Sequence, residues 1–153
     1  MISGMDWLRR LAGRLGTAAA LVVLLAGVAL AQPATPPQSY VVYFDFGSAK
    51  LSALARPVIG EAAVAIRHGQ EQKSLSHVKV IGYSDTSGSD ESADRISRQR
   101  AAAVRAELVR EGIAADFITT EGRGKHELAV PTKDHVRNPR NRRVRIMLYR
   151  PGD

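Results

Sequence analysis

The segment Ile81-Gly82-Tyr83-Ser84-Asp85-Thr86-Ser87-Gly88 decides the fold of this 153-residue chain. Before it, apolar and polar side chains alternate over residues 77–82, which predicts a strand bounded by turn residues. After it, Ser89 or Asp90 can cap a helix whose first turn is acidic. Asp85 therefore stands where a strand ends and a loop opens, and such an exposed position on a rigid support favours a functional role.

The predicted helix carries an arginine within its apolar face. At about 100° per residue, one face collects small and apolar side chains, namely Ala93, Ile96, Val104 and Leu108. Arg100 falls in the middle of this face, and burial of an unpaired charge is costly. Because Arg100 can reach over the strand end, we expect Arg100 and Asp85 to flank one shallow pocket. Two interpretations stay open: a structural ion pair between them, or a site in which Asp85 binds an ammonium and Arg100 a carboxylate.

The first 31 residues have the layout of a secretory signal peptide. Three arginines precede an uncharged run from Leu15 to Ala31, which ends in a small-x-small Ala-Leu-Ala site. We predict cleavage after Ala31 and a proline-rich linker at residues 32–39. The alternative is an uncleaved membrane anchor, because this run lies at the short edge of the ~17–25 residues needed to span a bilayer.

The chain is basic and contains no cysteine. Its formal net charge is +7, and removal of residues 1–31 lowers this to +5. A basic surface attracts nucleic acid, lipid headgroups or a carboxylate-rich cell wall, and export makes nucleic acid the least expected partner. The absence of cysteine excludes disulfides, thiol catalysis and a lipid-modified cysteine after the apolar run.

The remaining patterns predict one α+β domain at residues 40–150, a two-layer sandwich of order β-α-β-α-β-β with a mixed sheet and both helices on one face. Aromatic residues should lie on the core face of the first strand, and Gly112 suits a helix stop. Whether the first helix is kinked at Pro57 or begins near Arg56 stays open. The predicted elements are a strand at 40–46, a helix at 51–68, a strand at 77–82, a helix from 90 to Gly112, and strands at 117–121 and 143–149.

Alternation in the last strand separates two faces. Val144, Ile146 and Leu148 should face the core, with Arg143 and its alternate residues outward. By the same parity, Arg142 begins on the inner side. Between the last two strands, a loop over residues 122–140 is long enough to suggest a functional role.

Several separated motifs, in the right order, resemble the OmpA-like C-terminal domain. That family includes the periplasmic domains of peptidoglycan-associated lipoproteins and of the flagellar stator protein MotB. The resemblance covers roughly residues 40–149 and rests on Gly82 to Gly88, Ile96-Ser97-Arg98-Gln99-Arg100-Ala101, Gly112-Ile113, Gly122-Arg123-Gly124 and Asn141-Arg142-Arg143-Val144.

The resemblance implies non-covalent binding of peptidoglycan through the diaminopimelate of its stem peptide. Asp85 then corresponds to the family's ammonium-binding residue, Arg100 to its carboxylate-binding residue, and Arg142 to a further residue lining the site. It also implies a periplasmic or envelope location in a Gram-negative bacterium, with tethering or scaffolding as the role. The supporting loop and neighbouring positions are Ser84, Thr86, Gly88, Ser97 and Asn141.

The sequence departs from the family beside this site, where Tyr83-Ser84 replace the usual histidine and threonine. The departure leaves Asp85 and Arg100 in place, so we expect binding to persist. The expected partners are peptidoglycan and other envelope proteins. An inner-membrane-anchored stator or secretion-system subunit would use the same binding chemistry with an uncleaved N-terminal segment.

Catalysis, metals and cofactors are not expected. The four histidines, His68, His77, His126 and His135, lack the spacing of metal ligands. Ser84 and Ser87 have no histidine nearby in the loop to activate them. Nucleic-acid binding, the other alternative, would rest on the basic C-terminal region and would show a steep salt dependence.

Overall fold

The computed structural model describes residues 38–153, so the predicted signal peptide and most of the predicted linker lie outside the described residues. Within this range we find no helix with both the length and the apolar character needed to cross a bilayer. The regular elements are β1 (Gln38–Tyr43), α1 (Ala55–Glu71), β2 (His77–Gly82), α2 (Asp90–Arg110), the short 3-10 helix η1 (Ala115–Phe117), β3 (Ile118–Gly122) and β4 (Arg143–Tyr149).

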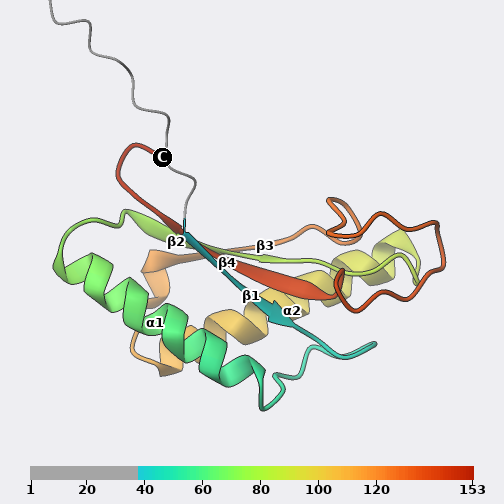
Figure 1. Cartoon of the computed structure of the whole chain (residues 1–153), viewed down its shortest axis with the longest axis horizontal. Coiled ribbons are helices and arrows are strands. Elements are labelled where there is room, and N and C mark those ends of the chain that lie inside the picture. Colours follow the sequence, from blue (N-terminus) through green and yellow to red (C-terminus); the bar gives the residue numbers. More distant parts are fainter. Residues whose placement is uncertain (1–37) are drawn as a thin grey trace, which may run out of the picture. The chain divides into compact units, whose positions relative to one another are not determined.

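The four strands form one mixed sheet in the order β1-β4-β2-β3 (Figure 1). β4 runs antiparallel to both of its neighbours, β1 and β2, whereas β2 and β3 are parallel. The parallel pair requires a crossover, and α2 provides it. This arrangement confirms the predicted α+β class and the mixed sheet.

Both helices pack on the same face of the sheet and share one apolar core. Alternate strand residues point into that core, as the predicted parity of β4 requires. Its members from the strands are Val42, Val78, Val80, Ile118, Val144, Ile146 and Leu148, and its members from the helices include Ile59, Ile66, Ala101, Val104 and Leu108.

Helix α2 is bounded by sequence signals at both ends. The Ser89 hydroxyl accepts a hydrogen bond from the backbone N–H of Ser92, which confirms one of the two expected caps. At the other end Gly112 has φ +91°, and Ile113 donates its backbone N–H to the carbonyl of Leu108 at 3.0 Å. This is the backbone pattern of a Schellman stop, so the predicted helix end at Gly112 is confirmed.

The first strand is displaced from its predicted range. β1 begins at Gln38 and ends at Tyr43, after which the chain turns and Ser48 donates to the carbonyl of Asp45. Gly47 has a positive φ within this turn. The prediction of a strand over 40–46 with aromatic residues on its core face is correct for Phe44, which is 4 % exposed, and wrong for Phe46, which is 50 % exposed, because the alternation of a strand does not continue through a turn.

The first helix begins at Ala55, one residue before Arg56, so the interpretation without a kink is correct. Pro57 then falls in the first turn, where its missing N–H has no carbonyl to bind. The N-cap residue is Leu54, whose side chain makes no capping hydrogen bond, while the hydroxyl of Ser52 just upstream accepts from the backbone N–H of Ala55 at 3.2 Å. Ser52, although a residue type that favours caps, is therefore not the N-cap.

Two glycines at one end of the sheet allow α2 to approach closely. Gly82 and Gly122 are register partners in β2 and β3. A Cβ on Gly82 would lie 2.0 Å from the backbone oxygen of Ser97, and one on Gly122 would lie 2.7 Å from its hydroxyl. We call this close contact between Ser97 of α2 and the two glycines the helix seam. It holds α2 against the strand end from which the Asp85 loop departs.

Candidate functional site

A cleft of about 300 Å³ opens beside that seam, between the end of β2, the turn after β1 and the first half of α2. Figure 1 shows these segments at the same end of the molecule, together with the loop that leads into β4. The residues that line it are Phe46, Gly47, Ser84, Asp85, Ser87, Gly88, Ser92, Arg95, Ile96, Gln99, Arg100 and Arg142. The structure therefore brings Asp85, Arg100 and Arg142 to one cleft.

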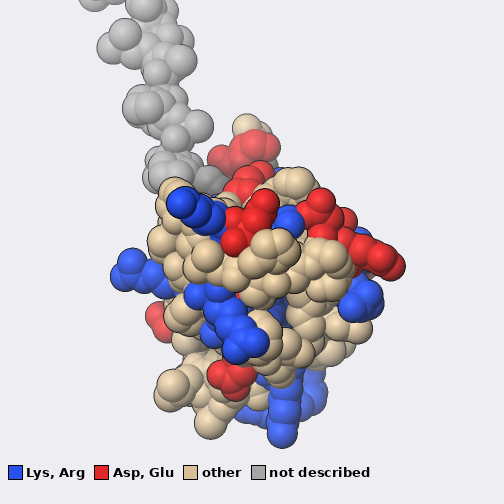
Figure 2. Space-filling view, turned by 90° about the vertical axis from the view of Figure 1, so that its right-hand side faces the viewer, with Lys and Arg blue, Asp and Glu red and all other residues tan. Residues whose placement is uncertain are grey.

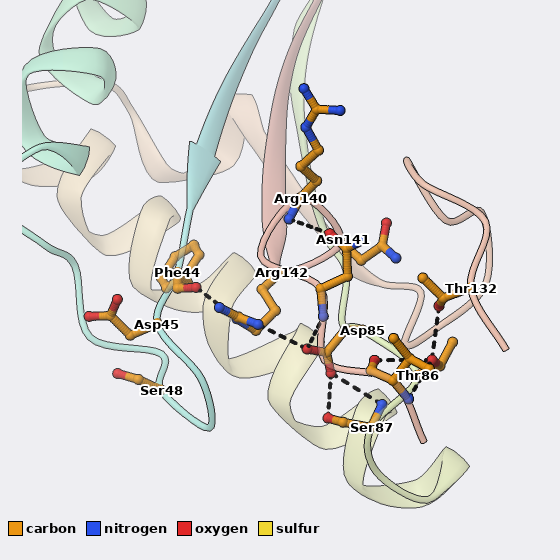
Figure 3. Close-up of polar contacts among 12 residues, drawn as sticks. Phe44, Asp45, Ser48, Asp85, Thr86, Ser87, Thr132, Arg140, Asn141 and Arg142 are labelled. Atoms are coloured by element: carbon orange, nitrogen blue, oxygen red, sulfur yellow. Dashed lines mark hydrogen bonds and ion pairs between the residues drawn. The ribbon is translucent and has the colours of Figure 1, made fainter. Parts of the chain in front are cut away.

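The carboxylate of Asp85 is 2 % exposed and is held by four hydrogen bonds (Figure 3). Its Oδ1 accepts from the hydroxyl of Ser87 at 2.5 Å and from the backbone N–H of Ser87 at 3.3 Å. Its Oδ2 accepts from the backbone N–H of Asn138 at 3.2 Å and from Nη1 of Arg142 at 3.1 Å. Its ionic partner is therefore Arg142, so a structural ion pair with Arg100, one of the two interpretations left open by the sequence, does not form.

These bonds keep Asp85 ionised. Burial alone raises the pKa of the carboxyl, but hydrogen bonds from Ser87, Arg142 and Asn138 outweigh it, so the pKa lies below its usual value of 3.8. The cleft thus contains a fixed negative charge at neutral pH.

Arg100 forms the second buried charge, with its side chain 1 % exposed. Its guanidinium reaches over the end of β2, as expected, and donates Nη1–H to the carbonyl of Tyr83 at 3.0 Å. It also donates Nε–H to Ser48 at 2.9 Å and Nη2–H to Asp45 at 3.2 Å, in each case to the backbone carbonyl. Desolvation, and secondarily the nearby charge of Arg142, lowers the pKa of Arg100 to about 10. Among residues 38–153, the partners of this cation are neutral carbonyls, and no anion is bonded directly to it.

Arg142 connects the two sides of the cleft. Its Nε–H donates to the carbonyl of Phe44 at 3.1 Å, while its Nη1–H donates to Asp85. Figure 3 shows its side chain lying between these two residues. The residue just before β4 thus ties the turn after β1 to the loop after β2, and its inward parity was predicted from sequence.

Thr86 and Asn141 tie the long loop to the site. The Thr86 hydroxyl donates to the carbonyl of Lys133 at 2.6 Å, and its own carbonyl accepts from the backbone N–H of His135 at 2.7 Å. The buried amide of Asn141 exchanges two bonds with the backbone of Val130, at 2.8 and 2.9 Å. These contacts give the loop over residues 123–142 its fixed path.

The other three predicted supporting residues also contribute to the framework. Ser84 donates its backbone N–H to the carbonyl of Gly124 at 2.6 Å. The hydroxyl of Ser97 accepts from the backbone N–H of Gly124 at 2.9 Å, within the helix seam. Gly88 lines the cleft, and a Cβ there would lie 2.6 Å from the Ser92 hydroxyl.

Arg143 differs from its predicted exposure. Its side chain points away from the core as expected but is only 7 % exposed, because the guanidinium stacks over the ring of Tyr83 at 3.9 Å. Its Nη2–H donates to the carbonyl of Glu127 at 2.9 Å. Strand parity cannot reveal that a distant loop covers the outer face here.

Several cleft residues were missed by the sequence reasoning. Ser92, Arg95 and Gln99 recur at helical spacing beside Ile96, so a second stripe on α2 was a usable signal. Phe46 was missed because it was assigned to a core strand. Its ring lies 3.8 Å below the guanidinium of Arg137, so the two side chains form an exposed stack between the turn and the long loop.

Comparison with known proteins identifies relatives over most of the domain. The OmpA family model matches residues 43–142. An outer membrane protein of Gluconacetobacter diazotrophicus is 36% identical over 121 residues, which are 75% of this chain and 31% of that protein. Outer membrane protein A of Bordetella avium is 33% identical over 104 residues, covering 68% of this chain and 52% of that protein.

Solved structures share the fold. The peptidoglycan-associated lipoprotein from Burkholderia pseudomallei superimposes with a TM-score of 0.63 at 23% identity, covering 71% of this chain and 89% of that one. The cell wall anchor of the T6SS from Pseudomonas aeruginosa gives a TM-score of 0.61 at 25% identity, covering 78% and 85%.

The matched segment amounts to about a third of the length of the first of these curated relatives and about half of the second. The family match nevertheless extends over well more than half of this chain, from the end of β1 to the residue before β4. It includes all four charged residues that line the cleft, Asp85, Arg95, Arg100 and Arg142. The chain belongs to the OmpA family.

Proposed function

We propose that this domain binds peptidoglycan non-covalently by the free end of diaminopimelate in the stem peptide. The observation that carries the proposal is that one cleft of about 300 Å³ is lined by both a buried carboxylate, Asp85, and a buried guanidinium, Arg100. The free end of diaminopimelate carries one ammonium and one carboxylate, so its charges complement this pair.

Arg100 and Arg142 have donors left for a carboxylate. A guanidinium has five N–H groups, and Arg100 uses three of them on backbone carbonyls. Arg142 uses two, on Phe44 and Asp85. An incoming carboxylate would accept from the remaining donors and would stabilise the charged form of Arg100, which desolvation now disfavours.

Asp85 would receive the ammonium with one local rearrangement. Two carboxylate oxygens offer about four acceptor positions, and all are engaged by Ser87, Asn138 and Arg142. Three of these donors are backbone groups or a buried arginine, but the Ser87 hydroxyl can rotate about its Cβ–O bond. We infer that the ammonium replaces this hydroxyl as the donor to Oδ1.

The family supports this assignment. A solved protein of the same fold is named a peptidoglycan-associated lipoprotein, and another is named a cell wall anchor. The related outer membrane proteins favour a Gram-negative envelope or periplasm as the location. We therefore propose a wall-binding role in that compartment, tethering or scaffolding rather than catalysis.

Sedimentation with purified peptidoglycan tests the proposal. The domain should co-sediment with diaminopimelate-type peptidoglycan and bind lysine-type peptidoglycan much more weakly, because lysine lacks the second carboxylate. Equal binding to both types would contradict recognition of the diaminopimelate tip. Absence of soluble fragments after incubation would separate binding from hydrolysis.

The mode of attachment is a separate question. We propose a free periplasmic protein, with cleavage after Ala31, and the alternative is a subunit of a stator or secretion system that retains the N-terminal segment. Mass spectrometry of the protein isolated from envelopes would report the N-terminus: a chain beginning at Gln32 supports cleavage, and an intact one supports the anchor.

A further inference from the structure

The cleft has more positive charge than a zwitterion needs. Among its lining residues, Arg95, Arg100 and Arg142 oppose one carboxylate, Asp85, which leaves an excess of two positive charges. The ammonium and carboxylate at the tip of diaminopimelate cancel each other and do not reduce this excess. A further anionic group on the ligand would reduce it.

Within residues 38–153, Arg95 is the cleft arginine whose guanidinium has neither a hydrogen-bond nor an ion-pair partner, whereas Arg100 and Arg142 have such partners. Arg95 lies on α2 four residues before Gln99, and both line the cleft on the side nearest to solvent. Ion pairs within residues 38–153 involve other arginines and lysines, and none of them includes Arg95. In contrast, Arg137 stacks on the ring of Phe46, which lines the cleft.

The charges on this end of the molecule are unevenly distributed. Figure 2 shows most of the acidic side chains in the upper part of the face, with a few lower down, and basic side chains in its middle and lower part as well as at its upper left. One acidic member of the α2 start, Asp90, is paired with Lys125 at 2.7 Å. A ligand carboxylate that reaches the middle of this face would meet basic side chains.

We propose that Arg95, assisted by Gln99, binds a second carboxylate of the stem peptide: the α-carboxylate of the glutamate that precedes diaminopimelate. This glutamate is linked through its side-chain carboxyl group, so its α-carboxylate stays free and lies next to the residue held in the cleft. The inference rests on the proposed function, because it assumes that diaminopimelate occupies the floor formed by Asp85 and Arg100. Such a contact would make the domain selective for stem peptides in which the α-carboxylate of the glutamate is free rather than amidated.

The test compares two soluble tripeptides, alanyl-γ-glutamyl-diaminopimelate and the same peptide with the glutamate α-carboxylate converted to an amide. Titration calorimetry would give the affinity of the protein, with its native N-terminus, for each peptide. We expect the wild type to prefer the free carboxylate by about fivefold, the magnitude of a solvent-accessible ion pair. The Arg95→Gln variant should bind both peptides with equal affinity.

Arg98→Gln is the matched control. It removes the same charge from the same helix, but Arg98 is exposed and does not line the cleft. This variant should keep the preference of the wild type. Raising the salt concentration should reduce the preference of the wild type and leave Arg95→Gln unaffected.

The outcomes separate the two proposals. If the wild type binds both tripeptides equally, or if Arg95→Gln keeps the preference, the role of Arg95 is wrong while the diaminopimelate site stands. If neither tripeptide binds the wild type, the proposed function itself fails and the inference falls with it.

Discussion

Two clefts of the same size, about 300 Å³ each, lie at opposite ends of the sheet and differ in what forms their floor. At the β2 end, Asp85 and Arg100 are almost completely buried. At the other end, the polar side chains that line the cleft, among them His68, Gln72 and Arg150, are exposed. Volume therefore does not distinguish a binding site here. Buried charges do distinguish a binding site, because a charge that the fold has removed from water interacts more strongly with a ligand of opposite charge.

The largest expected effect comes from removing one buried charge. Arg100→Ala should weaken peptidoglycan binding by about 2–5 kcal/mol, because one partner of a desolvated ionic contact is lost. Arg150→Ala, in the cleft at the opposite end, should leave the affinity within about twofold, as expected for an exposed charge. Isothermal titration with a diaminopimelate muropeptide measures both.

A fold-preserving variant makes this prediction decisive. Arg100 donates to three backbone carbonyls, so its truncation also lowers stability. Arg100→Lys keeps a cation but loses the planar fork, and it should fold and still bind more weakly than the wild type. Wild-type affinity in either folded variant would show that the two clefts do not differ in the way proposed.

The second prediction compares the backbone at the two ends. Gly82→Ala should destabilise the domain by about 1–3 kcal/mol or more, because the new Cβ meets the backbone oxygen of Ser97 at 2.0 Å. Gly69→Ala, at the other cleft, meets the side-chain end of Leu75 at 2.5 Å, which can rotate away, so its cost should be smaller. Urea denaturation of both variants measures the difference, and equal costs would contradict a rigid seam at the site.

The third prediction uses pH. Because hydrogen bonds lower the folded pKa of Asp85, this group stabilises the fold above its unfolded pKa, and the contribution is lost as pH falls through the folded pKa. The stability difference between wild type and Asp85→Asn should stay constant from pH 7 to about 4 and shrink below that. Thermal unfolding across this range measures it, and a difference that already shrinks at pH 6 would contradict the assignment.

The smallest effect concerns the hydroxyl that contacts Asp85. Ser87→Ala removes one donor from Oδ1, so the pKa of Asp85 should rise toward its usual value, as carbon NMR of the carboxyl would show. Binding should become slightly tighter, by about twofold, because the ammonium no longer competes with the hydroxyl. Substantially weaker binding would show that Ser87 itself contacts the ligand.

Local signals predicted the elements near the site well. β2 and β4 have the predicted bounds, and the ends of α2 follow from Ser89 and Gly112. These predictions succeeded because period-two alternation and capping chemistry depend on nearby residues alone. The strand ending at Phe46 failed for the same reason, since a turn closed by Gly47 interrupts the alternation that the prediction extended.

The positions of Asp85 and Arg100 were also predictable. Asp85 stands where a strand ends and a loop opens, and Arg100 is a charge within an apolar helical face. The hydrogen-bond partners of these two residues were not predictable. Asp85 is paired with Arg142, which lies 57 positions further along the chain, and Arg100 binds carbonyls of the turn after β1. Only the sheet order, with β4 between β1 and β2, brings these segments together.

The sequence by itself determined the α+β class, the order of the elements, the family and the residues that carry charge into the cleft. These follow from periodicity, caps and ordered motifs, all of which act over short stretches of chain. The tertiary structure alone decided which charges pair, that Arg95 is left unengaged among the described residues, and that one of two equal clefts has a charged floor. Such facts depend on distances between segments far apart in sequence, and the folded sheet sets those distances.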